Sequence, residues 1–151
     1  MNMLYSTMVF IHIFSAIIGM GPGFILIPVI KTAKNMDELR HAFVIKQRLH
    51  RFIMVGGTLL FLSGLSMGAI HPYLFHMIWY VVSLVLFIIA LAMGPFVLAP
   101  RTKPLKAKIA EDQGTEIPND IQASLKEMYR YEYVLNSLFL IIIVLMITKP
   151  F

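Results

Sequence analysis

The residue of this chain best suited to chemistry is His12. It lies in an apolar run from Leu4 to Ile30 that contains no Asp, Glu, Lys or Arg and is long enough to cross a bilayer. A polar group inside hydrocarbon is costly unless it is paired, so an intramembrane ionisable residue indicates a functional site. Imidazole is also a common ligand of metal ions and of haem iron. His12 is therefore a candidate ligand, and a hydrogen bond to a neighbouring helix is the structural alternative.

Two further histidines, His71 and His76, flank a short link between later apolar runs. At 1.5 Å per residue, His12 lies about 28 Å from Lys31 and His71 about 30 Å from Arg51. If both basic residues mark the inner interface, the three histidines share one layer near the outer surface. We therefore predict His12 as one axial ligand of a haem or metal, with His76 or His71 opposite.

Small residues recur at helical spacing in the same apolar runs. Gly19 and Gly23 form such a stripe in the first run, Gly64 and Gly68 in the second, and Ser83 belongs to one in the third. Residues three, four or seven apart share one face of a helix. Such stripes let membrane helices pack closely, and they also leave room for a flat ligand. The four glycines are therefore candidate cofactor-binding positions, with helix packing as the alternative interpretation.

The elements that must position these residues follow from composition. Of 151 residues, 58% are hydrophobic and 14% are charged, whereas soluble domains are about 45–50% apolar and about 25% charged. The apolar residues form four runs of about the length that spans a bilayer. We predict an all-α integral membrane four-helix bundle, a single domain over residues 1–151. Its spans are residues 4–30, 52–70, 74–99 and 133–148, joined by loops 31–51 and 100–132.

The basic residues predict the topology. Apart from Lys149, the 13 Lys and Arg residues all lie in the two long loops. The positive-inside rule places both loops in the cytoplasm and predicts an N-out, C-out protein of the cytoplasmic membrane. The same rule explains the net charge of +5, so we expect the lipid bilayer as a partner and no nucleic acid. The absence of cysteine excludes disulfides, thiolate metal sites and iron–sulfur clusters.

Parts of the long loops have helical patterns. Residues 36–50 are amphipathic and are expected to continue into the second apolar run as one helix. Asp120 is expected to cap another helix that leads into the fourth run. Residues 110–118, which include Gly114 and Pro118, are expected to form the mobile part of their loop.

Three segments carry a family resemblance: Ile11–Gly19, Arg48–Met54 and the terminal Val144–Phe151. Together they resemble a family of small four-helix bacterial integral membrane proteins over nearly the whole chain. More distantly, they are similar to the HemJ-type protoporphyrinogen oxidases, which are described as binding haem b. That resemblance implies haem b as a cofactor and His12 as the counterpart of the first-helix histidine. The arginine that follows the first-helix proline in those oxidases has no equivalent after Pro28.

The leading hypothesis is a membrane protein that binds haem b or a related porphyrin. It would act in electron transfer with a membrane quinone, or in haem handling. One alternative is a non-enzymatic accessory or assembly subunit of a larger membrane complex. Another is a small transporter or metal-handling protein that uses the outer histidines. Enzymatic activity and the oligomeric state, a homo-oligomer included, are left open by the sequence.

Overall fold

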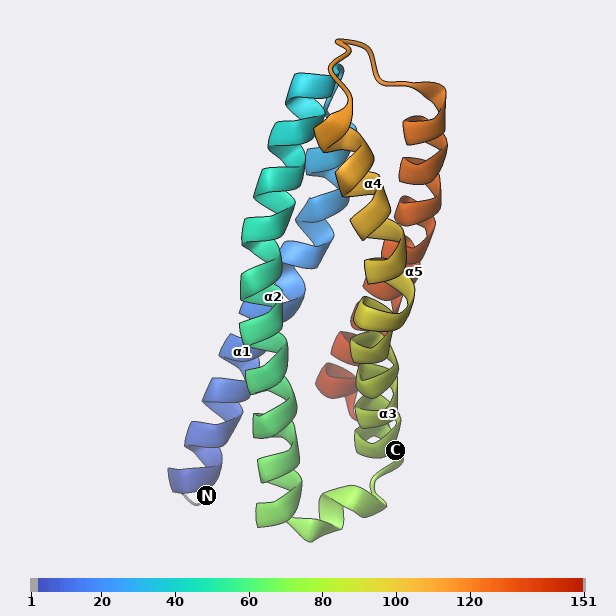
Figure 1. Cartoon of the computed structure of the whole chain (residues 1–151). Coiled ribbons are helices and arrows are strands. Elements are labelled where there is room, and N and C mark those ends of the chain that lie inside the picture. The colour runs from blue at the N-terminus through green and yellow to red at the C-terminus, as the bar shows by residue number, and fades with distance from the viewer. Residues whose placement is uncertain (1–2, 151) are drawn as a thin grey trace.

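A computed structural model describes residues 3–150, and within them the chain is helical and contains no strand. Four long helical rods, three of them single helices and one formed by consecutive helices in line, run antiparallel. The two ends of the chain lie at the same end of the bundle (Figure 1). The predicted all-α fold is confirmed over these residues, since four helices are long and apolar enough to cross a membrane. In chain order the elements are α1 (Met3–Lys31), α2 (Met36–Ile70), the 3₁₀ helix η1 (Pro72–His76), α3 (Ile78–Met93), the π-helical turn η2 (Gly94–Leu98), α4 (Ala99–Glu111) and α5 (Asn119–Thr148).

The helix α2 begins where the sequence supplies a cap. Asn35 Oδ1 accepts a hydrogen bond from the Glu38 N–H at 2.9 Å, and the Glu38 carboxylate accepts one from the Lys34 N–H at 2.7 Å. Both donors would otherwise lack a partner at the start of the helix. The helix ends before Pro72, which disfavours helical geometry in the residue that precedes it. The predicted fusion of residues 36–50 with the second apolar run into one helix is confirmed.

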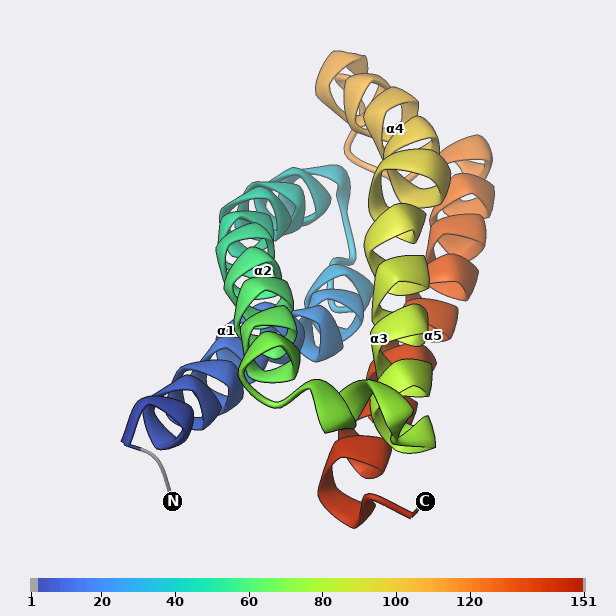
Figure 2. The same ribbon diagram turned by 90° about the horizontal axis from the view of Figure 1, so that it is seen from below.

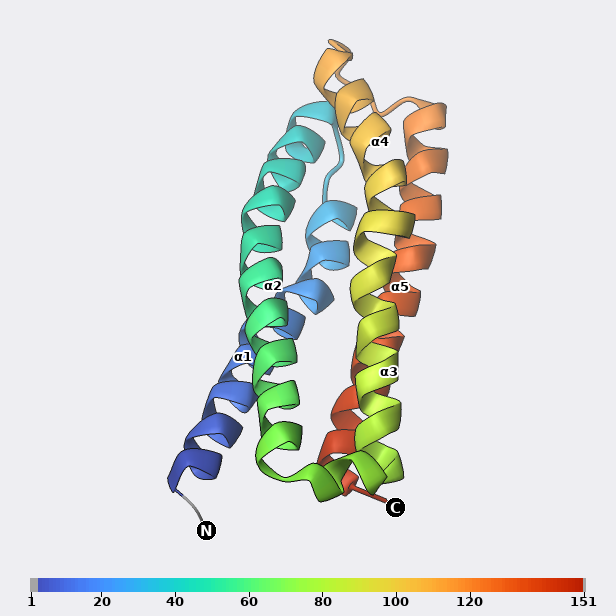
Figure 3. The same ribbon diagram turned by 60° about the horizontal axis from the view of Figure 1, so that its bottom comes forward.

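The predicted loop 100–132 is largely helical, and Pro95 shows how the chain continues through it. Proline lacks an N–H, and its ring would clash with the carbonyl one turn earlier in a regular helix. The chain widens here into the π-helical turn η2, in which the Ala99 N–H donates to the Gly94 carbonyl. The helix then resumes as α4, which extends the line of α3 to Glu111 (Figure 3).

The connection between α4 and α5 is short, because only residues 112–118 lie between the two helices. The predicted cap by Asp120 is wrong. The helix α5 begins at Asn119, with Pro118 at the cap position, so Asp120 lies in the first turn. Its carboxylate instead approaches Lys108 Nζ at 3.4 Å. A carboxylate in this turn still interacts favourably with the helix dipole.

A large buried core lies at the basic end of the molecule, beyond the apolar runs. Amphipathic segments of α2, α4 and α5 turn their apolar faces toward one another there and pack against the end of α1. The regions predicted as long loops therefore form a packed helical layer that continues the bundle. The buried residues of this layer are Ile30, Met36, Leu39, Ala42, Phe43, Leu105, Ile109, Ile121, Leu125 and Met128.

The rods form two pairs, α1 with α2 and α3–α4 with α5 (Figure 2). The first pair crosses at Gly19 and Gly56, where the two backbones touch. A Cβ atom added to Gly19 would lie 2.7 Å from the carbonyl carbon of Gly56, closer than real side chains approach. Small residues are what allow membrane helices to meet in this way. This crossing sets the depth of every residue of α1 relative to α2.

Candidate functional site

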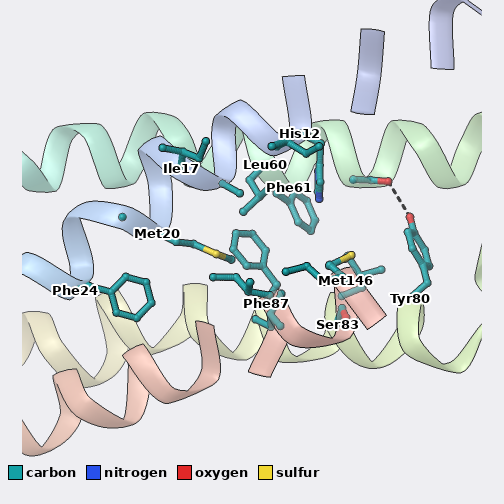
Figure 4. A pocket seen from close by; sticks show the side chains of 18 residues that line it. His12, Ile17, Met20, Phe24, Leu60, Phe61, Tyr80, Ser83, Phe87 and Met146 are labelled. Carbon is teal, nitrogen blue, oxygen red and sulfur yellow. Dashed lines mark hydrogen bonds between the residues drawn. The ribbon is translucent and has the colours of Figure 1, made fainter. Parts of the chain in front are cut away.

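A pocket of about 440 Å³ lies between the two helix pairs. All four long rods contribute to its wall, and His12, Tyr80 and Ser83 are the lining residues with polar side chains (Figure 4). An apolar pocket with a few converging polar groups is the usual form of a small-molecule site. The complete lining is His12, Ile13, Ala16, Ile17, Met20, Gly21, Phe24, Leu60, Phe61, Gly64, Tyr80, Ser83, Leu84, Phe87, Ile142, Ile143, Met146 and Ile147.

His12 extends from α1 toward the pocket, and its ring is held by a serine of α2 (Figure 4). His12 Nδ1 lies 2.9 Å from Ser63 Oγ, and the Ser63 hydroxyl, with its single proton, also lies 3.1 Å from the Leu60 carbonyl oxygen. Two neutral tautomers fit these distances. If Ser63 donates to Leu60, His12 Nδ1 carries the proton and Nε2 can accept a hydrogen bond; if Ser63 donates to His12 Nδ1, Nε2 carries the proton and can donate one.

Ser83 lies across the pocket from His12, on α3 (Figure 4). The residue has a relative exposure of 0%, and its Oγ has no hydrogen-bond partner among the described residues. Other helical hydroxyls in this protein donate to the carbonyl one turn earlier, for example those of Ser15 and Ser66. A buried hydroxyl without a partner costs about 1–3 kcal/mol. Ser83 is therefore an unsatisfied polar group in the wall of the pocket, and a ligand reaches its hydroxyl only when the side chains that cover it move aside.

Tyr80 forms the third polar part of the wall. Its hydroxyl donates to the Gly64 carbonyl oxygen at 2.8 Å, the bond drawn in Figure 4. Its ring stands edge-on to that of Phe75, with 5.4 Å between the centroids. Both aromatic side chains pack over Gly68, where a Cβ atom would overlap the tyrosine hydroxyl. Gly68 is therefore needed so that Tyr80 can reach α2.

The structure separates the three predicted histidine ligands. His71 and His76 do not line the pocket. The His71 ring stands edge-on to that of Tyr5 at 4.5 Å, and Tyr5 precedes His12 by two helical turns, or about 10 Å. His76 is exposed at the end of η1. The predicted common layer of histidines is therefore wrong, although ligand binding by each of them stays a prediction.

The physical reason is the register of α1 on α2. The depth estimate took Lys31 and Arg51 as markers of the same interface. Lys31 lies twelve residues from the helix crossing at Gly19, whereas Arg51 lies only five residues from its partner Gly56. Arg51 is consequently about 10 Å closer to the crossing, so a count from it places His71 too near the level of His12.

Of the four glycines predicted to bind a cofactor, Gly64 lines the pocket. A Cβ atom there would lie 3.2 Å from His12 Cε1, so Gly64 makes room for the imidazole. Gly23 instead receives α5, because Asn136 Nδ2 donates to its carbonyl oxygen at 3.2 Å. Gly19 forms the crossing with α2. The packing interpretation thus accounts for Gly19 and Gly23, as it does for the glycine under Tyr80.

Haem b does not fit this pocket as the helices stand. Its two carboxylates would need cationic partners, and no Lys or Arg lines the pocket. The volume is roughly three times that of an apolar cavity of about 150 Å³ that holds one benzene, so much of a porphyrin would have to lie outside it. Haem iron needs only one or two axial ligands; for a metal ion held by side chains alone, no three His, Cys, Asp or Glu residues within residues 3–150 gather closely enough.

An absorption spectrum tests the haem prediction directly. We expect protein purified from haem-replete cells to show no Soret band that depends on His12, because the pocket offers one imidazole and no cation for the carboxylates. The spectrum is recorded before and after dithionite for the wild type and for His12→Ala. A Soret band that is present in the wild type and absent from His12→Ala would restore haem b as the ligand.

Sequence reasoning did not identify Tyr80, Ser83 or Ser63 as site residues. In the sequence, Tyr80 follows Trp79, as aromatic residues at a membrane interface often do, and Ser83 is one member of a small-residue stripe. A usable signal was nevertheless present, because the two residues are three positions apart in an otherwise apolar run and so share a helix face. Ser63, directly before Gly64, gave no signal, since its role depends on the register of α1.

Comparison with known proteins identifies one family. No curated protein and no solved structure matches the chain. The profile of a family described as predicted integral membrane protein (DUF2269) matches residues 6–150, which include every residue that lines the pocket. The expected membership of a family of small integral membrane proteins is thereby confirmed, whereas the similarity to HemJ-type oxidases is not shown. The chain belongs to the DUF2269 family of predicted integral membrane proteins.

Proposed function

We propose that this protein binds a small apolar molecule with a hydroxylated ring, and that a membrane quinol is the class of ligand that fits. The observation that carries the proposal is the unpaired, fully buried hydroxyl of Ser83 on α3, which lies in the wall of the same apolar pocket as the imidazole of His12 on α1. Buried polar groups are nearly always hydrogen-bonded, so an unpaired one in a pocket indicates a missing partner.

The route into the pocket suits a ligand dissolved in the bilayer. Ile13 and Ile17 of α1 and Ile147 of α5 line the pocket and are also exposed, by 57%, 65% and 75% respectively. The pocket therefore opens sideways between α1 and α5, on a surface that is apolar and faces lipid if the helices span the membrane. An apolar molecule could enter there without passing through water.

The size of the pocket limits the part of the ligand that it encloses. A volume of 440 Å³ corresponds to roughly 18 non-hydrogen atoms, on the scale of about 150 Å³ for one benzene. That is enough for a substituted quinol ring and its first isoprenoid unit. The rest of an isoprenoid tail would leave through the opening beside Ile147 and lie among the lipid chains.

The hydrogen-bond inventory favours a ligand that donates. We assign His12 the tautomer in which Ser63 donates to Leu60, so that His12 Nε2 is an acceptor; the Tyr80 oxygen also accepts while its proton is held by Gly64. Ser83 can accept or donate. A quinol brings two hydroxyl donors to these acceptors, whereas the oxidised quinone brings two carbonyl acceptors and can use only Ser83 directly. The site is therefore expected to prefer the reduced form.

This proposal unites two of the functions expected from the sequence, electron transfer with a membrane quinone and a place in a larger membrane complex. With no redox group among the residues that line the pocket, the chain itself would hold and orient the quinol. Oxidation of the quinol would then need an electron acceptor on a partner subunit.

Binding of decylubiquinol to protein in nanodiscs tests the proposal. Trp79 is the only tryptophan and its ring lies 5.9 Å from that of Tyr80, so its fluorescence reports on the pocket. We expect a saturable change for wild-type protein. His12→Ala and Ser83→Ala should each weaken binding about tenfold, because each removes one hydrogen bond worth about 1–1.5 kcal/mol.

The matched control is Ser66→Ala, which removes a hydroxyl of α2 that is exposed and bonded to the Leu62 carbonyl. The affinity of Ser66→Ala for decylubiquinol should equal that of the wild type. Decylubiquinone should bind more weakly than decylubiquinol to every variant that keeps His12. Equal affinity in the wild type and in both pocket variants, or a signal that never saturates, would refute quinol binding at this site.

A further inference from the structure

A second candidate site begins at the basic end of α5 and is lined by none of the residues that line the pocket. A shallow groove of about 670 Å³ follows one face of α5, with Lys126 and Arg130 at one end and Val134 and Ile141 toward the other. These residues recur every three or four positions and so form one continuous stripe. Two cations at the head of an apolar strip have the pattern of an amphiphile with an anionic head.

The two cations of this groove have no carboxylate partner among the described residues. On other faces of α5, Glu127 pairs with Arg101 at 3.0 Å and the buried Glu132 pairs with Lys46. Lys126 and Arg130 form no ion pair within residues 3–150, and both are exposed. Their charge is therefore free to meet an anion from outside the chain.

A third cation borders the groove. Lys31 of α1 donates to the Tyr133 hydroxyl at 2.8 Å, and its ammonium lies 5.2 Å from the centroid of the Tyr129 ring. Both tyrosines line the groove, and no Asp or Glu does. Tyrosine is the side chain expected at the level of lipid headgroups, where its ring meets hydrocarbon and its hydroxyl meets water.

We propose that this groove binds an anionic phospholipid. The phosphate lies between Lys126 and Arg130, and one acyl chain follows the apolar stripe to Ile141. The eleven helical steps from Arg130 to Ile141 span about 16 Å, close to half of a hydrocarbon core of about 30 Å. The groove thus matches one lipid in one leaflet. Basic pockets at this level are known to hold anionic headgroups.

The lipid site does not depend on quinol binding, since it shares no residue with the pocket. Its test uses protein in nanodiscs of phosphatidylcholine with a minority of phosphatidylglycerol, released into native mass spectrometry. We expect the wild type to retain phosphatidylglycerol selectively. Lys126→Gln with Arg130→Gln should weaken that retention about 30-fold, on the basis of about 1 kcal/mol for each basic residue.

The control variant is Lys103→Gln with Arg48→Gln, which removes the same charge from exposed positions outside the groove. It should retain phosphatidylglycerol as the wild type does. Equal retention by the two double variants would overturn the proposal, whether both lose the lipid or both keep it. Displacement of the lipid by millimolar glycerol phosphate would also overturn it, because the site would then recognise a free phosphate and not a lipid.

Discussion

Gly56→Ala is expected to destabilise the protein by about 3 kcal/mol or more, the largest effect of any single methyl group in the bundle. A Cβ atom on Gly56 would overlap the backbone of Gly19, and no side-chain rotation could relieve that contact. The two helices would have to move apart along their whole crossing. Overpacking costs about 1–3 kcal/mol where side chains can adjust, so a contact between backbones lies at or above the upper limit.

The neighbouring glycine provides a matched control. A Cβ atom on Gly57 would meet only Leu91 Cδ2, at the ordinary distance of 3.8 Å, and one on Gly21 would meet nothing within 4 Å. Gly57→Ala and Gly21→Ala should therefore be neutral, or stabilising by up to about 1 kcal/mol through helix propensity. Unfolding by sodium dodecyl sulfate in mixed micelles measures all three variants. If Gly56→Ala and Gly57→Ala unfold at the same fraction of sodium dodecyl sulfate, α1 and α2 do not make a backbone contact at Gly19 and Gly56.

Loss of one member of the Lys46–Glu132 ion pair is expected to lower the free energy of unfolding by about 3–5 kcal/mol. The pair joins α2 to α5, and the side chains are only 13% and 6% exposed. Lys46→Met would leave the carboxylate of Glu132 buried beside Met128, without a counter-charge. The penalty comes from the uncompensated charge and not from the value of the pair itself.

That distinction can be measured with a second change. Glu132→Leu in the Lys46→Met background removes both charges, so it should recover most of the lost stability. The exposed pair of Lys108 and Asp120, at 54% and 63% exposure, is the control, and Asp120→Asn should cost at most about 1 kcal/mol. A double variant as unstable as Lys46→Met alone would show that α5 needs the ion pair for its position, contrary to this expectation.

The two proposed sites differ in their chemistry. At the end that carries both termini, His12 and Ser83 line an apolar pocket whose wall includes exposed apolar side chains. At the basic end, the helices extend into a packed layer whose outer surface carries unpaired cations beside tyrosines. The N-out, C-out orientation predicted from the basic residues would place the quinol pocket toward the outer leaflet and the lipid groove toward the cytoplasmic one.

Much of the secondary structure followed from the sequence because hydrocarbon leaves the backbone few choices. A spanning segment must satisfy its own N–H and C=O groups, so each long apolar run had to be a helix. The extension of α2 back to Met36 was also predictable, from its amphipathic pattern. The helix α4 was not predicted, because its prolines and charges read as a loop, and its apolar face is recognisable only against the core of α2 and α5.

The sequence by itself determined the number of spans, the clustering of charge in the two long loops and the isolation of His12 in an apolar run. Tertiary structure alone decided what His12 contacts, because the crossing of Gly19 with Gly56 sets the register that brings it to Ser63 and opposite Ser83. In a membrane helix, apolar side chains face both lipid and protein, so hydrophobicity does not distinguish the buried face. The shapes of the side chains at the crossings make that choice, and with it they set the position of the pocket.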